Sequence, residues 1–158
     1  MSLKLVYFKM RALAEAPQML MRCNDIKYEY VMSWIYFGEP WAKAKPKLNF
    51  KQLPMLEVSG QHQICQSIAI LKFLEDTAGL RITDPVEAAK ADAILQSSQE
   101  LFAPLNPTVN FAVGDDFLVK RDAMRPALST RFQELQDCLD ENGYKFFTDD
   151  TCRAAEFA

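Results

Sequence analysis

The stretch from residue 52 to residue 67 constrains this chain most, because three kinds of backbone feature follow one another within it. Leu53-Pro54 leads into an apolar run, a Ser-Gly pair at 59–60 predicts a turn, and Gln66-Ser67 stands where a helical pattern begins. Proline is favoured at the first residue of a strand, and Ser and Gly are favoured in turns. The free N–H groups of a helix start attract anions. The stretch therefore predicts a strand, a turn, a second strand and a helix that could hold a small, charged, peptide-like ligand.

The residues on either side of this stretch predict an α/β unit. Apolar spacing and turn signals divide the first 80 residues in the order strand, helix, strand, loop, strand, strand, helix. The predicted ranges are 3–8, 12–23, 28–32, 35–47 (a loop with one helical turn at 41–45), 55–58, 63–65 and 67–77. A helix between the first two strands and a later hairpin indicate a mixed sheet.

The second half of the chain contains helical patterns and no credible strand. Asp84, Pro85 and Glu87 form a strong helix start, with an N-cap, a proline at the first helical position and an acidic first turn. That helix should run toward residue 102, where Pro104 and Pro107 kink or end it. A second helix fits 116–141, with an apolar stripe and a stop at Asn-Gly, and a third begins at 152. We expect two domains, 1–80 and 81–158, the second all-helical and truncated at its end.

Composition and charge remove several classes of function. The net charge is −3 and the sequence pI is near 5.2, so no basic surface indicates a nucleic-acid partner. No apolar run is long enough to span a membrane, and the start of the chain does not have the pattern of a signal peptide. The four cysteines form no C-x-x-C pair, which favours reduced thiols in the cytoplasm. A single histidine, His62, makes a metal site improbable.

A family likeness is carried by several short motifs of the first 80 residues. Together they resemble a cytosolic glutathione transferase of the tyrosine type, closest to the sigma class, which includes glutathione-dependent prostaglandin D synthases. The residues that carry the resemblance are Tyr7-Phe8, Met10-Arg11, Ala14-Glu15, Trp41, Lys45, Gln52-Leu53-Pro54, Gln66-Ser67, Ala69-Ile70 and Phe73-Leu74. The family implies a thioredoxin-like N-terminal domain, an all-helical C-terminal domain and a two-fold homodimer.

The resemblance implies that Tyr7 is the catalytic residue. Its hydroxyl would donate a hydrogen bond to the sulfur of glutathione, the co-substrate. A donor to the charged form favours the thiolate, which is the nucleophile. The alternative is a tyrosine that packs at the rim of the sheet.

The other site residues implied by the resemblance would bind glutathione along its length. A cis Leu53-Pro54 bond would let the Leu53 main chain pair with the cysteinyl part. Gln66 and Ser67, at the helix start, would hold the glutamyl carboxylate. The glycyl end would lie against Trp41, Lys45 and Gln52. The alternatives are a trans proline that starts a strand, a serine that only caps its helix and a solvated lysine.

Two further residues have supporting roles by the same resemblance, and some positions depart from it. Arg11 would support Tyr7, and Phe50 would enter the partner subunit of a dimer or else cover its own core. The sigma pattern has a second arginine where this chain has Leu13, and an acidic residue that aligns best with Gln96. The helix-capping box of the last segment aligns with residues 153–156 and is lost.

The function implied is conjugation of the glutathione thiolate to small electrophilic, apolar or lipid-like substrates, without a metal. One alternative is a glutathione-dependent isomerase of the prostaglandin D synthase type. Another is a non-catalytic scaffold or ligand carrier within a larger assembly. The departures from the sigma pattern at Leu13 and Gln96 are compatible with this alternative.

Overall fold

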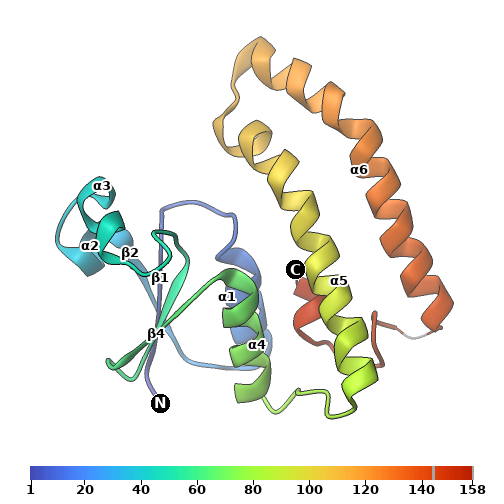
Figure 1. Cartoon of the computed structure of the whole chain (residues 1–158), viewed down its shortest axis with the longest axis horizontal. Helices are drawn as coiled ribbons and strands as arrows, with labels where there is room; N and C mark the ends of the chain where they lie inside the picture. The colour runs from blue at the N-terminus through green and yellow to red at the C-terminus, as the bar shows by residue number, and fades with distance from the viewer. Residues whose placement is uncertain (144, 158) are drawn as a thin grey trace. The chain divides into compact units, whose positions relative to one another are not determined.

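The protein is described here by a computed structural model (Figure 1), which covers residues 1–143 and 145–157, with the side chain at position 103 left out. Contacts between Cα atoms divide the chain into two compact units. The α/β unit spans Met1–Arg81, and the helical unit spans Ile82–Glu156.

A mixed four-stranded sheet forms the centre of the α/β unit, with the order β2-β1-β3-β4. Its strands are β1 (Leu3–Tyr7), β2 (Glu29–Met32), β3 (Met55–Val58) and β4 (His62–Cys65). The pair β1–β2 is parallel, whereas β1–β3 and β3–β4 are antiparallel. The mixed sheet predicted from the sequence is therefore confirmed.

Two helices, α1 (Glu15–Cys23) and α4 (Ser67–Thr77), lie side by side against the sheet (Figure 1). Their inward side chains are completely buried, as are the facing side chains of the strands. The fully buried set includes Leu5, Leu20, Met21, Met55, Leu56, Ile70, Leu71 and Leu74. Burying each such side chain contributes about 1.5–3 kcal/mol, so this layer is the main stabilising core of the unit.

The segment between β2 and β3 contains more helix than the sequence predicts. Helix α2 (Ser33–Phe37) precedes α3 (Trp41–Ala44) and a 3₁₀ turn, η1 (Lys45–Lys47), where we expected a loop with one helical turn. Gly38, with a left-handed φ of 65°, ends α2. The hydroxyl of Tyr36 donates a hydrogen bond of 2.5 Å to Glu57 Oε2 on β3. This contact ties α2 to the sheet, and such tertiary contacts are absent from the local pattern on which the prediction was based.

The helical unit is built mainly from α5 (Pro85–Asn106) and α6 (Gly114–Asn142), joined through a π-helical turn, η2 (Pro107–Phe111). Asp84 Oδ1 accepts hydrogen bonds from the N–H groups of Val86 (3.0 Å) and Glu87 (2.9 Å), which confirms the predicted cap. Helix α5 continues through Pro104 as far as Asn106, four residues beyond the predicted end near 102. The end of α6 at Gly143, with a φ of 63°, agrees with the Asn-Gly stop.

The last segment differs from the predicted helix at 152–158. It forms a 3₁₀ turn, η3 (Ala154–Phe157), and position 158 lies outside the described residues. The residues of the expected capping box make other contacts. Arg153 pairs with Asp149 at 2.6 Å, and Glu156 Oε1 accepts a hydrogen bond from the Phe147 N–H group at 3.0 Å.

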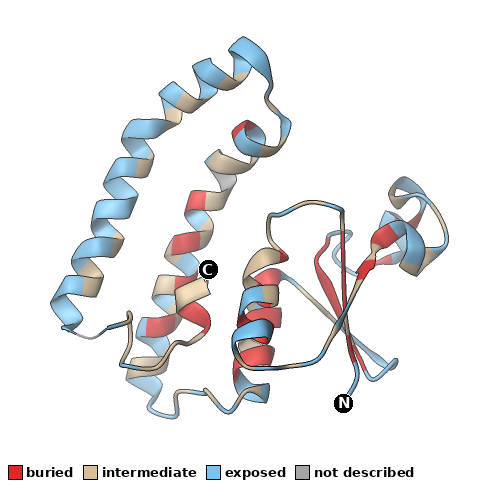
Figure 2. Ribbon diagram, turned by 180° about the vertical axis from the view of Figure 1, so that it is seen from behind, coloured by how far each residue is buried: buried red, intermediate tan, exposed pale blue. Residues whose placement is uncertain are grey.

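Helix α6 buries none of its residues, although its apolar stripe follows helical spacing (Figure 2). Phe132 remains 56% exposed. The other stripe residues, Phe117, Met124, Leu128, Leu135 and Leu139, are half-buried. The pattern thus predicts the helix and its more sheltered face, but no described part of the chain covers that face completely.

A search of the described helices finds none long and apolar enough to cross a membrane. The four cysteines are free thiols.

Candidate functional site

A cavity of about 280 Å³ opens on the α/β unit where several separated segments meet. It is bordered by the residue after β1, the loop before α1, helix α3, the segment 51–54 that precedes β3, and the start of α4. Its lining residues are Phe8, Leu13, Trp41, Lys45, Lys51, Gln52, Leu53, Pro54, Gln66 and Ser67. The structure therefore brings together Trp41, Lys45, Gln52, Leu53, Pro54, Gln66 and Ser67, which the sequence analysis proposed to act together.

The start of α4 borders this cavity. Gln66 is the N-cap residue and Ser67 is the first helical residue. No side chain caps this helix, so the first-turn N–H groups are not used by a capping side chain. Because Ser67 lies inside the helix, the interpretation of Ser67 as only an N-cap does not describe its position. The Gln66 amide instead donates a hydrogen bond of 3.1 Å to Gln52 Oε1, and this bond links α4 to the segment before β3.

Two cavity residues other than glycine have positive φ angles: Lys51 at 53° and Gln66 at 75°. L-residues rarely adopt such angles. Residues that do adopt them are concentrated at active sites and ligand-binding sites. Between these two residues, the Leu53–Pro54 peptide bond is cis, as the resemblance implies.

The charges at the cavity are positive. Lys45 and Lys51 supply two ammonium groups, and no acidic side chain lines the cavity. Neither lysine forms an ion pair with a described residue, whereas nearby Lys47 pairs with Glu39. Together with the start of α4, this arrangement suits a ligand that carries two separated anionic groups.

Tyr7, the last residue of β1, is only 5% exposed and does not line the cavity itself. The ring centroids of Tyr7 and Phe8 are 5.2 Å apart, and those of Phe8 and Trp41 are 5.4 Å apart. Tyr7 therefore packs against Phe8, which lines the cavity together with Trp41. The backbone N–H group of Leu13, a lining residue, donates a hydrogen bond to the Tyr7 hydroxyl oxygen. Burial raises the pKa of Tyr7, and this hydrogen bond opposes the rise. The phenol is therefore protonated at neutral pH and can donate its own proton.

Arg11 and Phe50 lie apart from the cavity lining. The Arg11 side chain is 90% exposed, and its Nε atom is 3.9 Å from Glu15 Oε1. Phe50 is 58% exposed. In place of the arginine of the sigma pattern, Leu13 presents an apolar side chain at the cavity wall.

The sequence analysis did not propose three of the lining residues, Phe8, Leu13 and Lys51, as parts of the site; it named Leu13 only as a departure from the sigma pattern. Phe8 directly follows the strand-ending Tyr7, and Lys51 directly precedes Gln52, so each adjoins a proposed site residue. That adjacency was a usable signal. Within the described residues, no cluster of three or more His, Cys, Asp or Glu side chains could hold a metal ion.

Comparisons with known proteins agree with this arrangement. Residues 1–76 match the family model described as "Glutathione S-transferase, N-terminal domain". Glutathione S-transferase 1 of Ascaris suum is 31% identical over 147 residues, which cover 90% of this chain and 69% of the relative. Hematopoietic prostaglandin D synthase of Gallus gallus is 37% identical over 137 residues, covering 87% of this chain and 64% of the relative. The crystal structure of the glutathione S-transferase from Ascaris lumbricoides aligns with a TM-score of 0.84 at 28% identity, covering 99% of this chain and 77% of that structure.

The fold is thus a thioredoxin-like domain followed by a helical region, the architecture of glutathione S-transferases. The chain belongs to the glutathione S-transferase family. Within this family it is close to the nematode glutathione S-transferases of the sigma class, which are similar to hematopoietic prostaglandin D synthase.

Proposed function

We propose that the protein is a glutathione transferase that joins the thiolate of glutathione to small electrophilic, apolar substrates. The observation that carries this proposal is the cavity of the α/β unit. The ammonium groups of Lys45 and Lys51, which form no ion pair with a described residue, meet there with the segment that leads into β3 and with the uncapped start of α4. Family membership supplies the class of co-substrate.

The proposed position of glutathione follows from charge. Its glycyl carboxylate lies at Lys45 and Lys51, beside Trp41 and Gln52. Its glutamyl carboxylate lies at Gln66 and Ser67, where helix N–H groups favour an anion.

The cysteinyl part lies between these ends, along the approach to β3. There the main chain of Leu53, before the cis Leu53–Pro54 bond, offers backbone groups that pair with the peptide as an added strand would.

Tyr7 is proposed to stabilise the thiolate. Because its oxygen accepts a hydrogen bond from the Leu13 N–H group, the hydroxyl proton is left to donate to the glutathione sulfur. That donation favours the thiolate over the thiol. In the reaction with an aryl halide, the thiolate forms a bond to the ring carbon and the halide leaves with the electrons of the broken bond. The proton of the thiol goes to solvent.

The conjugation rate with an aryl halide tests this role. Tyr7→Phe should lower kcat/KM by about 10- to 100-fold, the usual effect of losing a hydrogen bond to a developing or full charge. Tyr28→Phe is the matched control, because the Tyr28 hydroxyl bonds to Gln18 and Arg22 and Tyr28 does not line the cavity. Equal rates for the wild type and Tyr7→Phe would remove Tyr7 from the mechanism.

The similarity to a hematopoietic prostaglandin D synthase supports a second candidate, a glutathione-dependent isomerase that returns glutathione unchanged. Product formation without glutathione consumption would identify it. Leu13 is apolar, Arg11 is exposed and no arginine of the described chain lines the cavity. This favours, as a third candidate, a non-catalytic carrier that binds glutathione without turnover.

We also propose a cytoplasmic homodimer, on the basis of family membership. The exposed ring of Phe50 is its contact with the partner subunit. Sedimentation of Phe50→Ala tests the contact, since a dimer that is unchanged in stability would remove Phe50 from the interface.

A further inference from the structure

A second cavity, of about 390 Å³, lies entirely within the helical unit. It is formed by the beginning of α5, the end of α6 and the segment at 147–148, and Figure 1 shows that these two helix ends lie at the same end of the helix pair. None of its lining residues belongs to the cavity of the α/β unit. The proposed glutathione site therefore leaves it unexplained.

The walls of this helical-unit cavity are held in place by hydrogen bonds. Asn142 Nδ2 donates to the carbonyl oxygens of Cys138 (2.9 Å) and Phe147 (2.7 Å). The Phe147 N–H group donates to Glu156 Oε1 at 3.0 Å. Both backbone groups of Phe147 are thus fixed, so this residue of the lining is held in place without a ligand.

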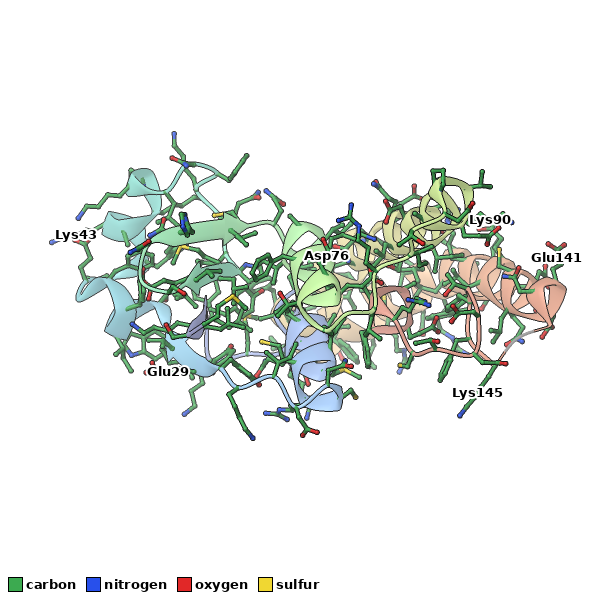
Figure 3. All side chains as sticks on the ribbon, turned by 90° about the horizontal axis from the view of Figure 1, so that it is seen from below. Glu29, Lys43, Asp76, Lys90, Glu141 and Lys145 are labelled. Atoms are coloured by element: carbon green, nitrogen blue, oxygen red, sulfur yellow. The ribbon has the colours of Figure 1, made fainter. Side chains whose placement is uncertain are left out.

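The lining combines apolar and charged residues. Ile94, Cys138 and Phe147 are apolar, and Glu87, Lys90 and Glu141 are charged. Figure 3 labels Lys90 and Glu141. Lys90 Nζ pairs with Glu87 at 2.8 Å, whereas Glu141 forms no ion pair with a described residue. The uncompensated charge of the lining is therefore negative. A carboxylate and an aromatic residue in one lining suit a ligand with an ammonium group on an apolar body.

A polar atom at the wall also lacks a partner. Thr148 lines the cavity, and its Oγ1 atom is shielded from solvent without a hydrogen-bond partner in the described chain. A buried hydroxyl without a partner is destabilising. Because Oγ1 is shielded from the cavity as well as from bulk solvent, it belongs to the packed wall and not to the surface that a ligand would contact.

We propose that this cavity is a second small-molecule site, separate from the glutathione site, and that it takes a cationic amine on a small aromatic or aliphatic body. The volume lies at the lower end of the range for small-molecule sites, about 300–1,000 Å³, and this limits the ligand to a fused two-ring system or smaller. The negative charge of the lining selects against anionic analogues.

Cys138 provides the readout, because it lines the cavity and carries a free thiol. The experiment measures alkylation of each cysteine by iodoacetamide, by mass spectrometry of peptides, with and without ligand. Cys23 is the internal control, since it is exposed and lies in the other unit. The probes are 1-naphthylmethylamine, 1-naphthalenemethanol and 1-naphthoate, which share one apolar body and differ in charge.

The expected result is that the amine slows Cys138 alkylation about tenfold at ten times its Kd, by mass action, and leaves Cys23 unchanged. The alcohol should protect more weakly, and the naphthoate least. Glu141→Gln should weaken protection by the amine about threefold. Glu134→Gln, which alters another carboxylate of α6 that pairs with Arg131, should not change it.

Two further variants test the fit. Ile94→Trp fills the cavity and should abolish protection by all three probes. Thr148→Val removes a hydroxyl that is shielded from the cavity, so it should leave protection by the amine unchanged and should not lower the stability of the free protein. The proposal is overturned if no probe protects Cys138, if Cys23 is slowed equally or if the naphthoate protects as well as the amine. None of these results depends on glutathione turnover.

Discussion

Helices α4 and α6 carry apolar residues at similar helical spacing, yet they are buried to opposite extents. Ile70, Leu71 and Leu74 of α4 are completely inaccessible to solvent. Helix α6 buries no residue (Figure 2). Phe132, in the middle of its stripe, is 56% exposed. Helical spacing identifies which face of a helix is apolar, but it does not specify what covers that face. The stability of α4 therefore derives from tertiary packing, and that of α6 depends more on local interactions.

Local interactions are abundant on α6. Lys120 pairs with Asp116 at 2.8 Å, one helical turn away, and Arg131 pairs with Glu134 at 2.9 Å. Arg131 also reaches Glu100 of α5 at 2.7 Å. Exposed pairs of this kind contribute only about 0.2–1 kcal/mol each. They support the helix without substituting for a core.

The largest expected effect tests this contrast directly. Leu71→Ala, in the buried face of α4, should lower the free energy of unfolding by about 3 kcal/mol, through lost burial and a new cavity. Leu128→Ala, in the half-buried stripe of α6, should lower it by less than about 1 kcal/mol. Urea unfolding monitored by circular dichroism measures both. Equal losses would mean that α6 is covered in solution as completely as α4.

A smaller effect is expected at the cations of the α/β unit. Lys45→Ala should weaken glutathione binding about fivefold, because one carboxylate loses an ammonium partner that is partly exposed. Lys43→Ala is the matched control, since Lys43 lies two residues earlier, on the adjoining helix α3 (Figure 3), and does not line the cavity. Calorimetric titration with glutathione gives both affinities. If the two variants bind equally, Lys45 does not contact the ligand.

The smallest effect concerns pH. The Tyr36 hydroxyl and Lys4 hold the pKa of Glu57 below its ordinary value of 4.5. A carboxyl group with a lowered folded-state pKa contributes stability above its unfolded-state pKa and loses it as pH falls through the folded-state value. Thermal unfolding of the wild type should therefore show a loss of Tm below pH 4.5, and Glu57→Gln should flatten that part of the profile. Glu29→Gln, at an exposed strand residue, should leave the slope unchanged, and an unchanged slope in Glu57→Gln would contradict the assignment.

Much of the α/β unit could be predicted from the sequence, because local signals there agree with the tertiary structure. The turn at Ser59-Gly60 and the polar start of α4 are local features, and the hairpin strand Met55–Val58 and helix Ser67–Thr77 match their predicted ranges. Helix α2 was missed because it is tied to the sheet by Tyr36 and Glu57, residues 21 positions apart in the chain. Local patterns do not contain such a contact.

The candidate site was predictable where charge and helix starts mark it, and less so elsewhere. Lys45, Gln52 and Gln66 were proposed through the resemblance to glutathione transferases, and all three line the cavity. The hydrogen bond from the Leu13 N–H group to Tyr7 was not predictable, because it depends on how the loop before α1 folds back. The helical-unit cavity was missed for a similar reason, since it arises where two helix ends and a later segment meet.

The central claim is that the α/β unit holds glutathione by both of its carboxylates. Calorimetry of the wild type and Lys45→Ala with glutathione and with γ-glutamylcysteine, which lacks the glycyl carboxylate, tests it most directly. We predict saturable binding of glutathione to the wild type, weaker binding of the dipeptide, and little difference between the two ligands in Lys45→Ala. Absence of binding at millimolar glutathione, or the same preference for glutathione in both proteins, would contradict it.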